Sequence, residues 1–256
     1  MNVYLILALV LFGYMTLWFF VSLIIKRNDV ADIAWGIGFV LLAWISFFIF
    51  GHGQPLALIV NALVTLWGLR LAVHIFRRNR GRKEDYRYMK WRKEWGRWFY
   101  ARSYGQVYLL QGFFLFLIIQ PVLFVNSLAE ARFSLLAWIG VFVWFAGFFF
   151  EVIGDGQLSR FIKNPENKGK IMQSGLWRFT RHPNYFGEVT LWWGVFLAAL
   201  GFPGGWRTII GPLTITCLIV FVSGIPMLEK KYAGRPDWAA YKKSTSVFFP
   251  LPPKKN

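Results

Sequence analysis

Long apolar segments alternate along this chain with short polar or densely charged ones. Seven apolar segments stand out, at about 2–25, 31–51, 55–76, 104–125, 133–153, 185–201 and 208–228. An α-helix needs roughly 20 apolar residues to cross a bilayer. We therefore predict an all-α, polytopic membrane protein, folded as a bundle of seven transmembrane helices in one domain over residues 1–256. The first segment lacks a basic start and a small-residue cleavage site, so we expect a retained span rather than a signal peptide.

Positive charge gathers on one side of the predicted bundle. If the N-terminus is outside, segments 26–30, 77–103, 154–184 and 229–256 face the cytoplasm together with the C-terminus, and they hold 26 of the 29 Lys and Arg residues. Cytoplasmic loops of membrane proteins carry this excess. The net charge of +17 therefore reflects topology, and we expect no nucleic acid as a partner. The long polar connections lie on the same side, so we expect the active site to face the cytoplasm.

Polar chemistry is concentrated at the start of the sixth predicted span. Residues 178–188 read RFTRHPNYFGE, directly before an apolar stretch at 191–200. Pro183 suits the first turn of a helix, and a helix N-terminus flanked by arginines is a natural seat for an anion such as a phosphate. A basic anchor at the membrane edge would account for the arginines, but not for the amide, phenol and carboxylate that follow. We therefore interpret this segment as part of a functional site.

Ionisable residues also lie within or at the edges of the predicted spans. They are Asp32, Arg70, His74, Glu151, Asp155, Glu188 and Glu229. Inside a bilayer such residues face the bundle interior or a watery cavity. One interpretation is that they pair with one another, for example Arg70 with Asp32, and simply fasten the helices together. We favour a ligand pocket that opens to the cytoplasm, because six of the seven lie toward that side.

Several other kinds of chemistry find no support in the sequence. The three histidines show no metal-ligand spacing, so we expect no metal, and the single cysteine allows no intramolecular disulfide. There is no Gly-x-Ser-x-Gly elbow and no glycine-rich fingerprint after a strand.

Loop 77–103 alternates aromatic and basic residues, which is typical of an interfacial amphipathic segment. Its start, Asn-Arg-Gly-Arg at 79–82, would also suit a phosphate, since arginine forks match phosphate geometry.

The motifs together resemble a known membrane family. Residues 151–155, 161–165, 174–188 and the tail 223–250 resemble the steroid 5-alpha-reductases, and among them the bacterial branch of unknown function, DUF1295. More distantly the chain is similar to the sterol C14/C7 reductases and the isoprenylcysteine carboxyl methyltransferases. The block Gly175-Leu176 with Asn-Tyr-Phe-Gly-Glu at 184–188 is quite specific to this superfamily. The resemblance implies a seven-helix bundle with a cytoplasmic nucleotide site.

In the reductases of this family, the resemblance implies that bound NADPH delivers a hydride to the β-carbon of an enone within the membrane. Asn79 resembles the family's asparagine near the nicotinamide, Asp155 a carboxylate that binds the cofactor, and Lys163 lies near a basic position that holds phosphate. Asn184 and Glu188 match the family's N-x-x-G-E motif. The full set that the resemblance places at the cofactor is Asn79, Arg82, Asp155, Lys163, Arg178, Arg181, His182, Asn184, Tyr185, Glu188, Glu229, Arg235 and Tyr241.

The chain departs from the steroid enzymes where the substrate carbonyl is polarised. Those enzymes use a glutamate in the second span and a tyrosine in the third, whereas residues 67–74 offer no tyrosine here. We expect the catalytic role to fall to Asp32 as a protonated acid, to Arg70 or to His74, since a desolvated carboxylic acid can donate a hydrogen bond.

Three functions follow from these observations. The first is a monomeric, NADPH-dependent reductase of a conjugated C=C bond in a lipophilic steroid or isoprenoid ketone. The second is a methyltransferase that uses S-adenosylmethionine, suggested by Arg181-His182-Pro183 and the tail. The third is a non-catalytic protein that binds lipid or sterol.

Overall fold

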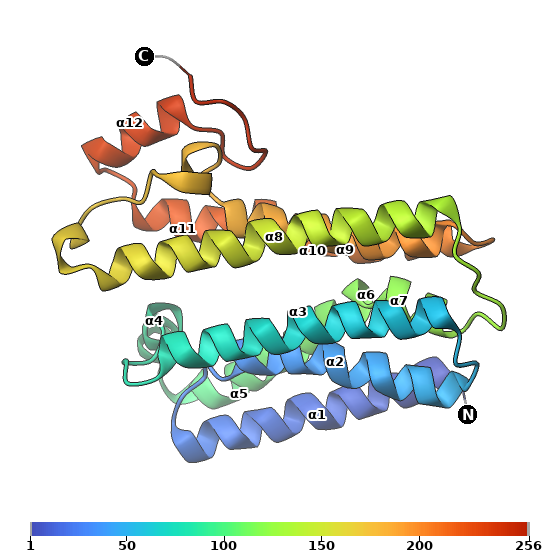
Figure 1. Ribbon diagram of the computed structural model, residues 1–256. Coiled ribbons are helices and arrows are strands. Elements are labelled where there is room, and N and C mark those ends of the chain that lie inside the picture. The colour runs from blue at the N-terminus through green and yellow to red at the C-terminus, as the bar shows by residue number, and fades with distance from the viewer. Residues whose placement is uncertain (1, 255–256) are drawn as a thin grey trace. The chain divides into compact units, whose positions relative to one another are not determined.

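The chain is helical throughout the part that the structure describes. A computed structural model describes residues 2–254, apart from the side chain of Lys231 (Figure 1). Within this range there is no β-strand, and the only β-type pairing is an isolated bridge between Thr180 and Ser246. The all-α prediction is confirmed. The chain divides into two compact units, one up to Phe133 and one from Ser134 onward, and each is described by itself. The single membrane domain stays a prediction.

The first unit begins with three long helices, α1 (Val3–Ile25), α2 (Ala31–Phe50) and α3 (Pro55–Asn79). Short connections make α1 and α2, and then α2 and α3, run in opposite directions (Figure 1). Helices α2 and α3 meet at a pair of glycines. A β-carbon placed on Gly36 would lie 2.5 Å from the carbonyl oxygen of Gly68, so only glycine allows the two backbones to come this close.

The second half of the first unit is a chain of shorter helices. They are α4 (Tyr86–Trp95), η1 (Gly96–Trp98), α5 (Phe99–Ser103), the π-helical η2 (Tyr104–Leu109), α6 (Leu110–Ile118) and α7 (Gln120–Asn126). Between Ile118 and Gln120 the helix bends by 50°. Pro121 lies at the start of α7, where its missing N–H and its ring do not allow the preceding helix to continue straight.

The second unit is built on a long helical pair. Its helices are α8 (Leu135–Lys163), α9 (Pro183–Leu200), α10 (Ile210–Cys217), α11 (Ile225–Lys231) and α12 (Pro236–Ser244), with short turns η3 (Pro165–Asn167), η4 (Gly175–Arg178), η5 (Gly205–Ile209) and the π-helical η6 (Leu218–Val222). After α12 the chain returns toward η4, because the backbone N–H of Arg181 donates to the carbonyl of Ser246 at 2.9 Å.

Glycines at intervals of seven residues bring α8 and α9 together. Gly140 and Gly147 on α8 face Gly194 and Gly187 on α9, and Gly154 faces the first residues of α9. A β-carbon on Gly147 would lie 2.5 Å from the backbone nitrogen of Leu191, and one on Gly194 would lie 2.6 Å from the carbonyl oxygen of Gly140. Small residues allow such close packing where lipid, and not water, surrounds the helices. The seven-residue spacing of these glycines is visible in the sequence and is a signal for this close contact.

Five helices in the described residues are long and apolar enough to cross a membrane, and six if the bent pair counts as one span. They are 3–25, 31–50, 55–79, 135–163 and 205–230, with 86–118 and 120–126 as the bent pair. These helices support an integral membrane protein. Helix α9 occupies the predicted span 185–201 but is not among them, since polar residues fill its first two turns. The count of seven spans and the orientation therefore stay predictions.

Candidate functional site

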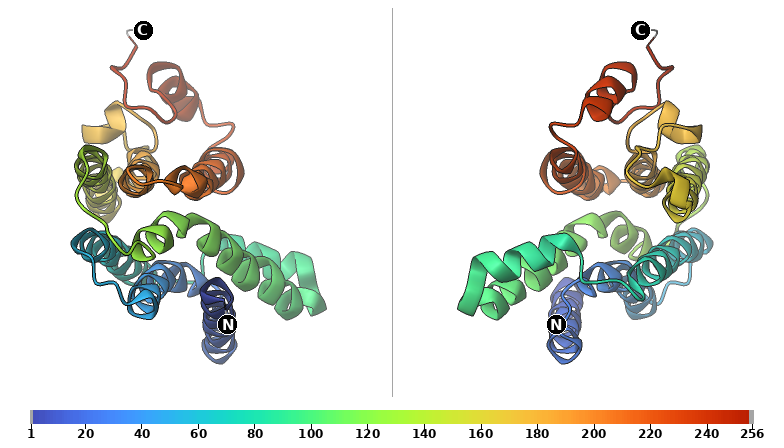
Figure 2. Two further views of the ribbon diagram at one scale, coloured as in Figure 1. Left: turned by 90° about the vertical axis from the view of Figure 1, so that its right-hand side faces the viewer. Right: turned by 90° about the vertical axis from the view of Figure 1, so that its left-hand side faces the viewer.

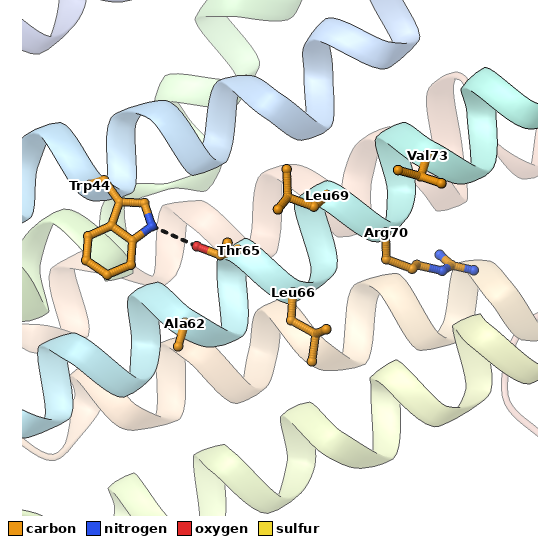
Figure 3. Close-up of a pocket in the computed structure, with 7 residues that line it drawn as sticks. All are labelled: Trp44, Ala62, Thr65, Leu66, Leu69, Arg70 and Val73. Atoms are coloured by element: carbon orange, nitrogen blue, oxygen red, sulfur yellow. Dashed lines mark hydrogen bonds between the residues drawn. The ribbon is translucent and has the colours of Figure 1, made fainter.

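The first unit contains an apolar groove along one face of α3. Its volume is about 560 Å³, and Figure 3 shows the seven residues that line it: Trp44, Ala62, Thr65, Leu66, Leu69, Arg70 and Val73. Toward one end the indole Nε1 of Trp44 donates to Thr65 Oγ1 at 2.8 Å. Arg70 lies toward the other end and is the only charged lining residue. His74 follows Arg70 by one helical turn and is half-buried.

Asp32, in the first turn of α2, accepts hydrogen bonds from α4. The guanidinium Nη2 of Arg87 donates to Asp32 Oδ2 at 2.8 Å, and the hydroxyl of Tyr88 donates to Asp32 Oδ1 at 2.8 Å. Arg87 also pairs with Asp85 at 3.0 Å. Burial alone would raise the pKa of the Asp85 carboxyl, but Arg87 holds that pKa below its usual range. Both oxygens of Asp32 thus already accept a bond within the protein.

Tyr88 and Arg87 are residues that the sequence analysis did not single out. Tyr88 is only 2% exposed, and its hydroxyl is bound to Asp32. Arg87 and Tyr88 could have been predicted from the complementary charges of the two segments that contact each other. Residues 27–32 read RNDVAD, and residues 84–92 read EDYRYMKWR, so acids and bases of the two segments can pair.

The predicted Asn-Arg-Gly-Arg segment follows α3 directly and is held by Arg27. The guanidinium of Arg27 pairs with Asp29 at 2.6 Å and donates to the carbonyl of Arg82 at 2.9 Å. The side-chain nitrogen of Asn79 is buried and has no hydrogen-bond partner among the described residues. A buried amide donor without an acceptor costs free energy unless a ligand or water supplies one. The role of Asn79 at a cofactor stays a prediction.

Asp155 and Asn184 come together across α8 and α9, as one cofactor site for both would require. Asn184 Nδ2 donates to Asp155 Oδ1 at 3.1 Å. Asp155 is 8% exposed, and Glu151, one turn earlier on α8, is 2% exposed. Gly154 and Gly187 make this approach possible, because a β-carbon on Gly154 would lie 3.1 Å from the backbone nitrogen of Asn184. Glu188 and Tyr185 are half-buried on α9, while Lys163 and Arg178 are exposed.

Arg181, His182 and Glu229 form a second cluster in this unit. Arg181 Nη2 lies 2.7 Å from Glu229 Oε1, and its Nη1 donates to the carbonyl of Thr245 at 2.6 Å. His182 Nε2 lies 3.4 Å from the same carboxylate oxygen, and Lys242 Nζ lies 3.5 Å from Oε2. Burial lowers the pKa of His182, although Glu229 acts in the opposite direction. His182 therefore favours the neutral form, with a buried Nδ1 that has no partner among the described residues.

An open cavity of about 340 Å³ adjoins this cluster. Four of its lining residues offer distinct chemistry: the carboxylate of Glu229, the cations of Arg235 and Lys242, and the indole of Trp238. Arg235 is positioned by an ion pair with Asp237 at 2.5 Å. Trp238 and Lys242 were not predicted as site residues. They lie one turn apart on α12, at the spacing that puts two side chains on one helical face.

Tyr241 lies on α12, the helix that also carries Trp238 and Lys242. Its hydroxyl donates to the carbonyl of Trp177, whose indole Nε1 in turn donates to the carbonyl of Gly154 at 3.1 Å. Burial raises the pKa of the Tyr241 phenol, which therefore stays a hydrogen-bond donor. The tyrosine thus connects α12 with η4 and α8.

In the described residues, no group of three or more His, Cys, Asp or Glu is close enough to hold a metal ion.

Comparison with known proteins gives a family match over most of the chain. Residues 18–245 match the family described as "Protein of unknown function (DUF1295)". An uncharacterized protein of the fission yeast Schizosaccharomyces pombe is 28% identical over 181 residues, which are 60% of this chain and 52% of the yeast protein. The chain thus spans about half the length of the curated relative that it matches. No protein of solved structure matches it.

Proposed function

Because the chain belongs to the DUF1295 family, whose function is unknown, we propose an activity from the residues themselves: the NADPH-dependent reduction of a conjugated C=C bond in a lipophilic enone. The enzyme would be a monomer of the bacterial inner membrane, with its site facing the cytoplasm. This proposal extends the resemblance to the steroid 5-alpha-reductases.

The observation that carries the proposal is the apolar groove that contains Arg70. A volume of about 560 Å³ is within the range of about 300–1,000 Å³ for small-molecule sites, which are mostly apolar with a few polar groups. A steroid or isoprenoid ketone has the matching form, a long apolar body with one carbonyl oxygen. We place that oxygen at the Arg70 guanidinium, because charge builds up on it when the conjugated double bond is reduced.

Arg70 takes this role in preference to Asp32. Arg87 and Tyr88 already donate to the two oxygens of Asp32, so the carboxyl is arranged as an acceptor and not as the donor that a carbonyl needs. In the proposed enzyme, Asp32 positions α4 at the start of α2. His74, one turn from Arg70, is the proposed proton donor to the substrate.

The residues around the cavity in the second unit fit a nucleotide with phosphates. Arg235 and Lys242 suit phosphate oxygens, Glu229 suits a ribose hydroxyl and Trp238 suits an aromatic ring, all around one cavity. The 340 Å³ cavity is large enough for only part of a dinucleotide. When bound, NADPH supplies the hydride.

A second candidate is a methyltransferase that uses S-adenosylmethionine on a lipophilic thiol or carboxylate. The cluster of Arg181, His182 and Glu229 favours it, because these residues lie in the parts of the chain that resemble that group. S-adenosylmethionine carries no phosphate, however, and would leave the cations of the cavity without a role. A non-catalytic lipid-binding protein would need neither cofactor.

Titration of the purified protein with NADPH and, separately, with S-adenosylmethionine tests the proposal. We expect NADPH to bind in the micromolar range or tighter, and substitution Lys242→Gln to weaken it. Binding of S-adenosylmethionine alone would replace the proposal with the methyltransferase, and binding of neither would favour the lipid-binding protein.

Arg70 is tested in turnover assays with steroid and isoprenoid enones. Substitution Arg70→Gln should lower kcat/KM by about 100-fold or more, the usual effect of removing an oxyanion donor, and leave NADPH affinity unchanged. Substitution Arg207→Gln is the matched control, since Arg207 is exposed. Equal activity of the two variants would remove Arg70 from the mechanism.

A further inference from the structure

Residues 86–103 form a helical hairpin, here called the surface hairpin. It consists of α4, the turn η1 and α5. Gly96 makes the turn with a positive φ of 49°, which favours glycine. In Figure 1 α4 is seen nearly end-on, whereas α1, α2 and α3 lie lengthwise. In Figure 2, which is turned by 90°, α4 lies lengthwise and the three long helices are seen nearly end-on. Within the first unit, α4 therefore runs across the direction of the spanning helices, as a helix that lies along a membrane surface does.

The surface hairpin is fixed to the unit by its inner face. Asp32 binds Arg87 and Tyr88 near the start of α4, and Asn28 Nδ2 donates to Ser103 Oγ at 2.7 Å at the end of α5. The rings of Tyr88, Trp91, Trp95 and Phe99 follow one another with centroid distances of 5.4, 5.2 and 6.0 Å. This aromatic row occupies the inner face, so the opposite face has to meet something else.

The outer face of the hairpin and the segment before it carry cations without anionic partners. Residues 77–103 contain eleven Lys and Arg but only three acidic residues. Arg87, Arg92 and Lys90 form ion pairs with carboxylates. The other eight have no ion pair among the described residues: Arg77, Arg78, Arg80, Arg82, Lys83, Lys93, Arg97 and Arg102. All eight are exposed, and this concentration of positive charge attracts anions.

Large apolar side chains are exposed among these cations. Trp98 is 58% exposed, Tyr100 52% and Met89 37%. A soluble polyanion would satisfy the charge but not these side chains. A phospholipid surface satisfies both, because Trp and Tyr settle at headgroup depth while Lys and Arg reach the phosphates. We propose that the surface hairpin is a binding surface for anionic phospholipid headgroups, centred on Lys93, Arg97 and Arg102. This proposal does not rest on the proposed reductase activity.

The test uses the full-length protein in bilayers of equal parts phosphatidylcholine and phosphatidylglycerol. Electron spin resonance with spin-labelled forms of each lipid measures how strongly the protein prefers the anionic one. Each cation near an anionic surface contributes about a five-fold preference. The variant Lys93→Gln, Arg97→Gln, Arg102→Gln should therefore lose most of the preference, and rising salt should weaken the wild type but not the variant.

A control variant removes the same charge elsewhere, by Lys168→Gln, Lys170→Gln and Lys243→Gln. These three residues are exposed in the second unit. Its preference should equal that of the wild type. Equal losses in the two triple variants would show that net charge, and not this surface, selects the lipid, and would overturn the proposal. Salt-sensitive binding of a labelled oligonucleotide in phosphatidylcholine discs, lost only in the hairpin variant, would assign the surface to a soluble polyanion instead. Thermal unfolding of each variant confirms that it is folded.

Discussion

Substitution Gly187→Ala tests whether the glycine contact between α8 and α9 holds the candidate site together. The added β-carbon would lie 2.4 Å from the backbone nitrogen of Glu151 and 2.5 Å from the carbonyl oxygen of Gly147. Both obstacles are backbone atoms, which cannot rotate away as a flexible side chain can. An ordinary van der Waals distance begins near 3.4 Å, so the helices must separate by close to one ångström at this point.

That separation should weaken both the fold and the site. Overpacking a tight contact costs about 1–3 kcal/mol, which lowers the melting temperature of a unit of this size by roughly 3–10 °C. Asn184 lies three residues before Gly187, so its 3.1 Å hydrogen bond to Asp155 should lengthen beyond a useful distance. We therefore expect a several-fold loss of NADPH affinity in addition to the loss of stability.

The assay compares thermal unfolding and NADPH titration of the purified variant with those of Gly156→Ala. Gly156 also lies in α8, but a β-carbon there meets only the flexible end of Arg160, at 3.9 Å. Alanine favours the helix more than glycine does, so this control should be as stable as the wild type or more so. If Gly187→Ala unfolds at the same temperature as Gly156→Ala, the reasoning about close backbone packing is refuted.

Three further predictions concern the charged clusters. Glu229→Gln should destabilise the second unit by about 3–5 kcal/mol because it removes the carboxylate partner of the buried Arg181 guanidinium. Asp237→Asn, which breaks the exposed pair with Arg235, should leave stability nearly unchanged. Chemical denaturation measures both variants, and similar losses would contradict the burial argument. Tyr88→Phe removes a hydrogen bond to a carboxylate and should cost about 1.5–3 kcal/mol, which thermal unfolding of the variant against the wild type checks. Burial lowers the pKa of His182, so the folded protein favours the neutral imidazole. The stability that His182 contributes is complete above its ordinary pKa of about 6.5 and is lost as the pH falls through its lower pKa in the folded state. Melting temperatures over this pH range should therefore fall less for His182→Gln than for the wild type, and parallel curves would count against this assignment.

Apolar length and charge placement determined much of this protein directly from its sequence. The all-helical class and the integral membrane character follow from runs of about 20 apolar residues. An unbroken apolar run of this length crosses a bilayer as an α-helix, because the helix pairs every backbone polar group within the segment. Asp155 and Asn184 were both predicted to bind the cofactor because they stand in motifs that carry the family resemblance, and that role stays a prediction. The cofactor, the substrate and the orientation remain predictions on the same footing.

Other features were decided only by the tertiary structure. Asp32 was one of three candidates for the catalytic role, and the sequence did not indicate its partners, Arg87 and Tyr88, which lie 55 and 56 residues further along the chain. Periodicity describes one helix at a time and carries no information on which side chains of distant helices meet. The same reason explains why Trp238 and Lys242 were missed, and why the glycine spacing of α8 acquired its meaning only when α9 lay against it. Sequence determined which segments are helical and where charge is costly, while packing decided which charges satisfy one another.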